Sequence, residues 1–453
     1  MANIIIKSKK LLLLLGDIII FYLALYLTLL WRYGYPVNSA SWQSHAGVFV
    51  AVFVLWLIVF FINDFYDLKI SYNSVKLVNN LLKLFIINGV VAVVLFYFFI
   101  PLLGSDIKPQ RVLLIDLIFS FVLIFIWRKF FYHFIKSDKI ANNVLIIGQS
   151  PIIADELFKE INNRPQLGYK AMQLLHLSDN LKEFCLKNKI NILLSAENLK
   201  NNPELTKNIF SCLSLGIDVY NINSFYENIT GKVPVEYIDH GWFLENLTEN
   251  SKNATDAAIR IFDIIFSLIG LLISLPFWPL IMLGVRTSSN GPIFLRQKRV
   301  GKNGETFPFK KFRSMITNAP DGSAEGESGP IWAATNDKRV TKFGKILRKT
   351  RIDELPQLIN ILKGEMSFVG PRPERPEFVE MLAKEIPFYQ ERLLVKPGLT
   401  GWAQLYGPAY GGSKAESLEK IKYDLYYVKN RSLFLNFSIV LKTLRVVLGG
   451  RGQ

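Results

Sequence analysis

The chain has very few cysteines: Cys185 and Cys212 are the only two among 453 residues. Their separation matches no zinc-binding spacing and supplies no disulfide framework, which fits a protein of a reducing compartment. Zinc-finger spacings and aromatic RNA-binding signatures are also absent. These absences disfavour a disulfide-stabilised secreted domain and a nucleic-acid-binding protein. We interpret the two cysteines as small buried apolar side chains.

Charge is scarce in the first part of the chain and abundant in the rest, and the whole carries a formal net charge of +16. A basic balance of this size fits nucleic acid, an anionic membrane surface or a phosphate-bearing substrate. Long apolar runs are present and nucleic-acid motifs are not. We therefore expect membrane lipids and a phosphorylated substrate as partners, and no nucleic acid.

Four apolar runs precede the first soluble-looking segment, and each is close to the roughly 20 residues that cross a bilayer. They are Leu11–Trp31, Ala46–Ile62, Leu81–Leu103 and Val112–Phe134. Basic residues gather before the first run, around the loop that joins the second and third runs, and at the end of the fourth: Lys7, Lys9, Lys10, Lys69, Lys76, Lys83, Arg128, Lys129, Lys136 and Lys139. The positive-inside rule then puts both ends of this four-helix unit in the cytoplasm. The first run is long and lacks a clear cleavage site, so we do not interpret it as a signal peptide.

From Ala141 the pattern changes to short β-branched runs that alternate with polar helical stretches. The runs Val144–Ile147, Ile190–Leu194 and Ile217–Tyr220 predict a small α/β domain with a parallel sheet. Gly148 follows the first run as in a Rossmann-like dinucleotide fold, but the second and third glycines of that fingerprint are absent. We favour a structural or regulatory role for this domain over nucleotide or coenzyme binding.

A fifth apolar run, Ile264–Val285, is interrupted by Ser274, Pro276 and Pro279. Proline removes a helical hydrogen bond and kinks the chain, so the run divides into two short halves. Basic residues flank both ends, beginning with Arg260 on one side and Arg286 on the other, which favours the same cytoplasmic face for both. A re-entrant helix that bends at Pro276 satisfies this, and an ordinary fifth span is the alternative.

The most informative stretch contains the adjacent carboxylates Asp353 and Glu354. Apolar residues at helical spacing follow them, Pro356 is tolerated in a first turn, and Gly364 is a stop signal. This pattern predicts Asp353 as the N-cap of a helix. The positive end of a helix stabilises ionised carboxylates, which suits a nucleophile or a Mg²⁺ ligand. Taken alone, such a pair is more often only a cap.

Cationic residues surround the pair in sequence. Arg348 lies within a turn of the carboxylates, and Arg372 stands between Pro371 and Pro373, which fix its backbone and suit two-point binding of phosphate. A rigid loop with a surface arginine is the alternative. Upstream, Lys311 and Arg313 add positive charge that fits either phosphate binding or a membrane-facing strand.

Five separated motifs make the chain recognisable. In order they are Arg296–Gly301, Phe309–Met315, Asp353–Gln357, Gly370–Pro373 and Lys396–Trp402. From about Thr255 to the C-terminus the chain resembles bacterial monotopic phosphoglycosyl transferases. The preceding helices and α/β domain resemble the large form of that family, which includes the undecaprenyl-phosphate glucose- and galactose-phosphate transferases that prime exopolysaccharide synthesis.

The resemblance implies a role for each matching residue. Asp353 matches the nucleophile that forms a covalent phosphosugar intermediate and expels UMP from a UDP-sugar, and Glu354 matches its partner, which acts with Mg²⁺ or the lipid phosphate. The remaining matches are Arg348 and Arg372 as phosphate- and nucleotide-contacting arginines, Asp424 as a further acidic active-site residue, and Ser274 and Pro276 as the helix break of the membrane anchor. Here Leu275 separates the last two, where the family often has them adjacent. The acceptor implied is undecaprenyl phosphate, and large members suggest a homodimer.

These patterns together predict a membrane protein of the α plus α/β class. We expect four transmembrane helices in residues 1–138, a Rossmann-like α/β domain in 139–250, a re-entrant helix in 251–290 and a mainly α catalytic domain in 291–453. The soluble parts should face the cytoplasm of a bacterial inner membrane. The helix expected at Leu433–Leu448 could lie flat in the interface or pack as an ordinary helix.

Three rival functions remain. A many-helix lipid-phosphate transferase would need roughly twice the membrane spans available here. Enzymes that join CDP-alcohols place several aspartates in membrane helices, a pattern absent from these runs. A non-catalytic membrane scaffold that regulates polysaccharide assembly is disfavoured by the intact carboxylate pair and its arginines.

Overall fold

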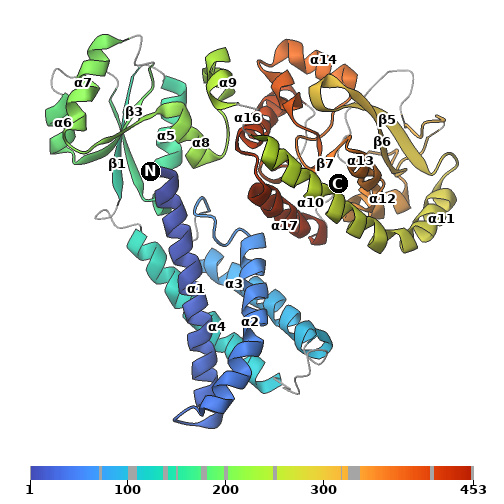
Figure 1. Cartoon of the computed structure of the whole chain (residues 1–453), viewed down its shortest axis with the longest axis horizontal. Helices are drawn as coiled ribbons and strands as arrows, with labels where there is room; N and C mark the ends of the chain where they lie inside the picture. The colour runs from blue at the N-terminus through green and yellow to red at the C-terminus, as the bar shows by residue number, and fades with distance from the viewer. Residues whose placement is uncertain are drawn as a thin grey trace. The chain divides into compact units, whose positions relative to one another are not determined.

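The computed structural model is mostly helical, and its described part covers residues 2–70, 74–99, 110–135, 141–148, 151–174, 181–197, 202–247, 252–317, 319–324, 337–408 and 413–449. Two compact units divide the chain, Met1–Thr230 and Gly231–Gln453. Each is described separately below (Figure 1).

Long helices form at each of the four predicted apolar runs. They are α1 (Ala2–Tyr33), α2 (Ser39–Ile62), α3 (Ser74–Val94, continued by a π-helical turn at Leu95–Phe99) and α4 (Gln110–Ile135). Among the described residues, four helical stretches are long and apolar enough to cross a membrane: Ile6–Tyr33, Ser39–Ile62, Val75–Phe98 and Asn253–Ser288. The end of the third run, at Leu103, lies outside the described residues.

A buried ion pair joins the first and last helices of this bundle. Arg128 Nη2 of α4 lies 2.5 Å from Asp17 Oδ2 of α1, and both side chains are fully buried. The Tyr66 hydroxyl donates to the same carboxylate oxygen at 2.8 Å, and the Arg128 guanidinium stacks over the Phe65 ring. Arg128 therefore holds two helices together, whereas the sequence analysis used it only as one of the basic residues at the end of the fourth run.

The α/β domain contains a four-stranded parallel sheet in the order β2-β1-β3-β4. Its elements are β1 (Asn142–Ile147), α5 (Pro151–Asn162), β2 (Tyr169–Leu174), α6 (Leu181–Lys187), β3 (Ile190–Ser195), α7 (Pro203–Leu213), β4 (Asp218–Asn221) and α8 (Ile222–Thr230). Helices α6 and α7 cover one face and α5 and α8 the other (Figure 1). The three predicted strands are confirmed, and edge strand β2 was missed.

Both cysteines lie in the core between the sheet and helices α6 and α7, as expected for small buried side chains. Gly148 ends β1 with a φ of +114°, and a Cβ there would lie 3.1 Å from Glu197 Cγ. A glycine is therefore required at the carboxyl end of the first strand.

The second unit begins at Gly231, before the predicted domain boundary at residue 250. Residues 231–247, which include α9 (His240–Asn246), bury Val233 and Trp242 in one apolar cluster with Val379 and Ile421. By packing, this segment belongs to the second unit rather than to the domain expected over 139–250, because its apolar side chains are buried there.

The remaining elements of the second unit are mainly helical. They are α10 (Asn253–Ser274), α11 (Trp278–Ser288), β5 (Phe294–Val300), β6 (Thr306–Phe312), α12 (Lys342–Thr350), α13 (Gln357–Lys363), β7 (Ser367–Val369), α14 (Pro376–Glu385), β8 (Gly398–Thr400), α15 (Trp402–Tyr406), α16 (Lys414–Asn430) and α17 (Leu433–Leu448). Strands β5 and β6 form an antiparallel hairpin, and β7 pairs with β8 in parallel.

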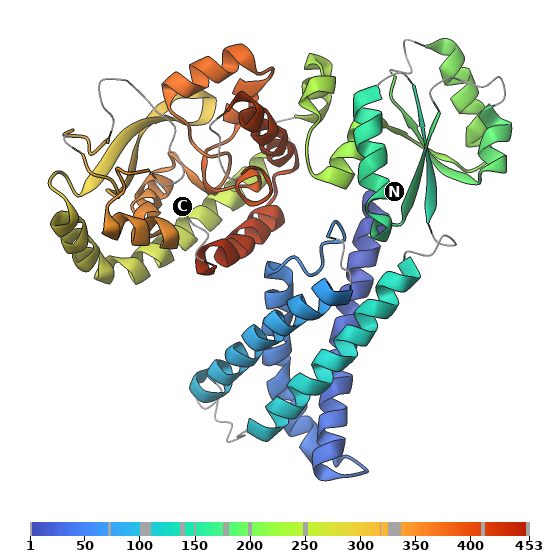
Figure 2. The same cartoon turned by 180° about the vertical axis from the view of Figure 1, so that it is seen from behind.

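Helices α10 and α11 are separated by a 3-10 turn, Leu275–Phe277, and run along one edge of the unit (Figures 1 and 2). Pro276 lies in this turn, where its missing N–H costs no α-helical hydrogen bond. Ser274 is buried, and its hydroxyl accepts a hydrogen bond from Trp278 Nε1 at 3.3 Å. Both residues therefore lie at the junction of the two helices.

Helix α10 is bonded to the elements around the carboxylate pair. The Arg260 guanidinium donates to the carbonyl oxygens of Ile361 and Leu362, both at 2.6 Å, at the end of α13. The Asp263 carboxylate accepts from the Ser367 hydroxyl at 3.0 Å and from the Phe368 N–H at 2.9 Å. These bonds fix the position of α13, and hence of the residues just before it.

Candidate active site

The backbone at the carboxylate pair differs from the predicted cap. Arg351 adopts a left-handed conformation (φ +58°) that ends α12, and Ile352–Glu354 form a 3-10 turn before α13. The residue that precedes α13 is Pro356, without a side-chain cap, so the prediction of Asp353 as an N-cap is wrong. The reason is local: the chain reverses at Arg351, and both carboxylates fall inside the turn. Left-handed non-glycine residues are uncommon and concentrate at functional sites. Gly364 ends α13 as predicted, with a φ of +85°.

Glu354 is held by two arginines. Its Oε1 accepts from Arg351 Nη1 and Arg372 Nη2, each at 3.1 Å, and the side chain is almost fully buried. Burial alone would raise the pKa of Glu354, but the charges of Arg372, Arg351 and Lys311 outweigh it and leave that pKa below its ordinary value. Glu354 is therefore ionised and fixed in direction.

Asp353 has different surroundings although it is the adjacent residue. The side chain is 4% exposed, and within the described residues its buried Oδ1 has no hydrogen-bond partner. Burial raises the pKa of Asp353 to about 6, with the charge of Glu354 adding to the effect and Lys311 and Arg348 opposing it. A buried carboxylate oxygen without a partner is energetically costly, and such groups gather where a ligand or reactant binds.

Two cations from separate elements face Asp353. Lys311 projects from β6, and burial lowers the pKa of its ammonium to about 8 against the opposing charge of Asp353. Arg348 projects from the last turn of α12, where its Nε donates to the Ser314 hydroxyl at 2.9 Å. Among the described residues its terminal nitrogens make no other hydrogen bond, so they remain available to an anion.

The loop that carries Arg372 is held through three consecutive carbonyl oxygens. The oxygen of Pro371 accepts from the Gly398 N–H at 2.9 Å, that of Arg372 from Arg392 Nη2 at 2.9 Å, and that of Pro373 from Arg299 Nη1 at 3.2 Å. The prolines thus restrict the backbone while neighbouring strands and arginines anchor it. Arg372 is preorganised beside Glu354.

Two further predicted site residues lie elsewhere. The Arg313 guanidinium is buried and donates to the carbonyl oxygens of Val285, Ser289 and Asn290 at 3.3, 2.6 and 2.9 Å. It closes the C-terminal end of α11 and does not face the carboxylate pair. Asp424 of α16 pairs with Arg392 at 2.9 Å, so it acts on the site through the arginine that holds the Arg372 loop.

Three residues of this arrangement escaped the sequence analysis. Arg392 positions Arg372, and Ser314 positions Arg348. Asp263 connects α10 to β7. Ser314 lies inside the Phe309–Met315 motif, which was a usable signal. Arg392 lies in no motif, and Asp263 lies at the start of an apolar run, so both needed the fold to reveal their partners.

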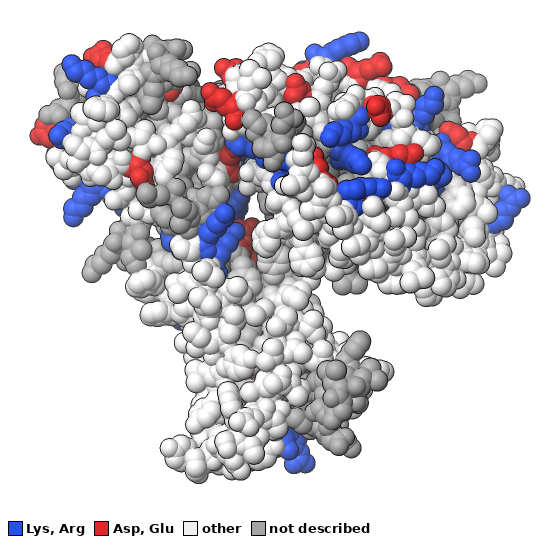
Figure 3. Space-filling view, viewed as in Figure 1, with Lys and Arg blue, Asp and Glu red and all other residues white. Residues whose placement is uncertain are grey.

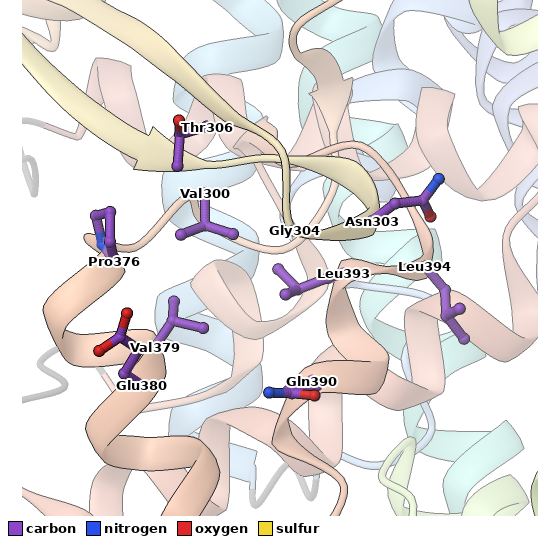
Figure 4. A pocket seen from close by; sticks show the side chains of 10 residues that line it. All are labelled: Val300, Asn303, Gly304, Thr306, Pro376, Val379, Glu380, Gln390, Leu393 and Leu394. Carbon is purple, nitrogen blue, oxygen red and sulfur yellow. The ribbon is translucent and has the colours of Figure 1, made fainter.

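A separate pocket of about 380 Å³ lies between the β5–β6 turn, α14 and the turn at Tyr389–Leu394 (Figure 4). Its described lining is largely apolar, with Val300, Val379 and Leu393, and includes no Lys or Arg. It contains none of the predicted site residues. The pocket therefore lacks the charge that a phosphorylated substrate needs, and we do not assign the chemistry to it.

The second unit is similar in sequence to known proteins. The family model described as bacterial sugar transferase matches residues 254–450. A relative from Aeromonas hydrophila named UDP-N-acetylgalactosamine-undecaprenyl-phosphate N-acetylgalactosaminephosphotransferase is 39% identical over 53% of this chain and 55% of its own length. A Xanthomonas campestris pv. campestris relative named UDP-glucose:undecaprenyl-phosphate glucose-1-phosphate transferase is 42% identical over 38% of this chain and 35% of its own length.

The match to these first two relatives thus spans about half or less of their length. A third relative, the exopolysaccharide production protein PSS of Rhizobium leguminosarum bv. phaseoli, is 41% identical over 41% of this chain and 92% of its own length. This last match covers nearly all of that relative. The chain therefore belongs to the bacterial sugar transferase family.

Proposed function

We propose that this protein transfers a sugar 1-phosphate from a UDP-sugar to undecaprenyl phosphate through a covalent intermediate on Asp353. UMP is released, and the polyprenyl-diphosphate-sugar starts exopolysaccharide or O-antigen synthesis. The observation that carries the proposal is the contrast within the pair: Glu354 is fixed by Arg351 and Arg372, whereas the buried Oδ1 of Asp353 has no partner among the described residues. The names of the relatives point to the same reaction class.

The first step forms a bond between an Asp353 oxygen and the phosphorus that bears the sugar. The bond from that phosphorus to the bridging oxygen breaks, and the oxygen keeps the electron pair as it departs with UMP. Lys311, Arg348 and Arg372 offset the repulsion between the carboxylate and the diphosphate. In the second step a phosphate oxygen of the lipid attacks the same phosphorus and regenerates the Asp353 carboxylate.

Mg²⁺ fits the groups present. The free Oδ1 of Asp353 and the adjacent Glu354 carboxylate are hard oxygen donors. Among the described residues no group of three or more His, Cys, Asp or Glu forms a complete metal cage. Mg²⁺ commonly takes one or two carboxylates and completes its shell with substrate phosphates and water. When bound, the ion would neutralise phosphate charge, with Asp353 and Glu354 holding it.

The apolar surface of the second unit supports a membrane-associated site. Large side chains on α10, α11 and α17 are exposed, including Leu272 (77%), Leu280 (69%) and Phe434 (76%). Figure 3 shows this side of the unit without charge, while Lys, Arg, Asp and Glu gather on the side away from these helices. We propose that this apolar side enters the cytoplasmic leaflet of the bacterial inner membrane, which brings the site to headgroup depth.

A re-entrant arrangement of α10 and α11 is favoured over a continuous span. A Cβ at Gly270 of α10 would lie 3.1 Å from Leu358, and one at Gly284 of α11 would lie 2.5 Å from Phe343. Both halves thus pack closely on elements of the same unit, α13 and α12. A straight span would carry one half across the bilayer, away from that unit.

The first test is product formation by the full-length protein in detergent with Mg²⁺ and undecaprenyl phosphate. We expect UMP release with one of UDP-glucose, UDP-galactose or an N-acetylated UDP-sugar, and a phosphosugar adduct on Asp353 in mass spectra taken before lipid is added. Asp353→Asn should give neither product. Glu385→Gln, which removes an exposed acid paired with Lys414, is the control. UMP release by Asp353→Asn would overturn the nucleophile assignment.

The same assay distinguishes an enzyme from a non-catalytic scaffold, because a scaffold would leave every UDP-sugar intact while still binding its partners. We also propose a structural or regulatory role for the α/β domain, and a homodimer as the assembled form of the protein. The mass of the detergent-solubilised full-length protein tests the dimer: it should equal two chains and remain so in Asp353→Asn. A mass of one chain would remove the dimer from the proposal and leave the transfer reaction standing.

A further inference from the structure

Helix α16 carries a lysine, Lys420, on the face that is turned toward the Arg372 loop. Lys420 lies in none of the five sequence motifs. Lys420 and Asp424 are one turn apart on this helix and so lie on the same face. Asp424 pairs with Arg392 at 2.9 Å, and Arg392 donates to the Arg372 carbonyl oxygen, also at 2.9 Å. The face of α16 that carries Lys420 is therefore turned toward the Arg372 loop.

The charges that act on Lys420 agree with this placement. The groups that interact with its ammonium are Glu374, Arg372, Asp424 and Arg392, all on or beside that loop. Burial lowers the pKa of Lys420, with Arg372 and Arg392 adding to the effect and the two carboxylates opposing it. Lys420 is half-buried in a region that already contains two arginines.

Lys420 also lacks a bonded partner. Within the described residues its ammonium makes no hydrogen bond and no ion pair. Lys422, two positions along the same helix, shows the contrast: its Nζ lies 2.8 Å from Glu236 Oε1 and 3.6 Å from Glu419 Oε2. A partly desolvated cation beside other cations, with no anion bonded to it, is what a binding site for an anionic ligand requires before the ligand arrives.

The cations around the carboxylate pair fall into two groups. Lys311 and Arg348 act most strongly on Asp353 among the carboxylates, whereas Arg372 bonds Glu354 and interacts with Glu374. The charges that act most strongly on Lys420 are those of Glu374, Arg372, Asp424 and Arg392, so it lies on the Arg372 side of the carboxylate pair. The diphosphate of a nucleotide-sugar has two phosphates, so each group of cations can bind one of them: Lys311 with Arg348, and Arg372 with Lys420.

We propose that Lys420, together with Arg372, binds the phosphate of the departing nucleotide, while Lys311 and Arg348 bind the phosphate that Asp353 attacks. This assignment rests on the proposed function and deepens it. As the phosphorus–oxygen bond to the leaving group breaks, the bridging oxygen keeps the electron pair and the departing phosphate gains one negative charge. An ammonium already in place stabilises that charge without any proton transfer.

The test compares three variants of the full-length protein: Lys420→Met, Lys420→Arg and the matched control Lys422→Met. For Lys420→Met we expect inhibition by the product UMP to weaken about tenfold or more, and the KM for the UDP-sugar to rise, because a charge-assisted contact to phosphate is lost. Lys420→Arg should retain binding within a few-fold, and Lys422→Met should behave as the unmodified protein does. Equal melting temperatures establish that the variants are folded.

Calorimetric titration of UMP keeps this inference separate from the proposed function, since it requires no turnover. Weaker UMP binding by Lys420→Met than by Lys422→Met supports the assignment. Equal UMP binding by the two variants overturns it, even if the enzyme turns over UDP-sugar normally. If no UDP-sugar is cleaved by the unmodified protein, the proposed function fails, and the titration still decides whether Lys420 binds a nucleotide phosphate.

Discussion

Each of the two units buries a carboxylate beside an arginine, and the comparison shows what distinguishes structure from chemistry. In the helical bundle, Asp17 and Arg128 meet directly at 2.5 Å, and the charge of each is neutralised by the other. In the second unit, Arg351 and Arg372 both bond Glu354, and the neighbouring Asp353 keeps a buried oxygen without a partner in the described part of the chain. Burial and charge are common to both sites, and each leaves one buried carboxylate oxygen, Oδ1 of Asp17 and Oδ1 of Asp353, without a partner among the described residues. The difference is that the other oxygen of Asp17 is bonded to Arg128 and Tyr66, whereas within the described residues the Asp353 carboxylate makes no hydrogen bond or ion pair at all.

The largest expected effect is on catalysis, from Asp353→Asn. Activity should fall at least about 10³-fold, because the proposed nucleophile is removed. The melting temperature should stay equal or rise, since the change removes the cost of a buried charge that the fold does not neutralise. Turnover assays and thermal unfolding in detergent measure the two quantities. A large loss of stability would show that Asp353 resembles Asp17 and not a poised reactant.

Arg128→Met should have the opposite effect on stability to Asp353→Asn. Removing one partner of a buried ion pair typically costs about 3–5 kcal/mol, because the other charge stays buried and alone. We expect a strongly lowered melting temperature, and partial recovery in the double variant Asp17→Asn with Arg128→Met, which leaves no unpaired charge. No recovery in the double variant would mean that Arg128 stabilises the bundle mainly through the Phe65 ring.

These two sites also show how far the sequence could predict the molecule. The apolar runs and three of the four strands of the parallel sheet could be predicted because each depends on a local pattern of residue types. The candidate site at Asp353–Glu354 came instead from the resemblance of five separated motifs to a known family, since the pair taken alone predicted only a helix cap. Strand β2 was missed because its polar and apolar residues (Tyr169–Leu174) are those of an edge strand exposed on one side. Local patterns suffice where the neighbours in sequence are also the neighbours in space.

Other features depended on tertiary contacts. The left-handed conformation of Arg351 is stabilised by the fold and contradicts local propensity, which is why the cap at Asp353 was mispredicted. Arg313 is of a residue type that suits phosphate binding, yet its guanidinium donates to three carbonyl oxygens at the C-terminal end of α11. The same residue type serves either purpose, and only the position of its partners separates them.

The pH dependence of activity and of stability is a third way to distinguish Asp353 from the ion-paired carboxylates. Because burial raises the pKa of Asp353 to about 6 and lowers that of Lys311 to about 8, activity should rise through the first value and fall through the second. The folded state retains the Asp353 proton between about pH 4 and 6, where an unfolded chain has lost it, so this residue makes stability decrease as pH rises through that window. Asp353→Asn should abolish this slope, and unfolding measured from pH 4 to 7 tests it. An unchanged slope would assign the titration to another group.

The smallest effect is expected from Asp424→Asn, which changes a residue that acts through another. Asp424 bonds Arg392, and Arg392 holds the carbonyl oxygen of Arg372 and the Tyr389 hydroxyl. The amide preserves the shape and one acceptor oxygen but removes the charge, so Arg392 should shift slightly and loosen the Arg372 loop. We expect a decrease of about tenfold in kcat/KM for the UDP-sugar, mostly through KM, while the acidic limb of the pH profile set by Asp353 stays in place. A shift of that limb would mean that Asp424 takes part in the chemistry directly. Asp353 would then not be the one reacting carboxylate, because Asp424 would react as well although Arg392 neutralises its charge.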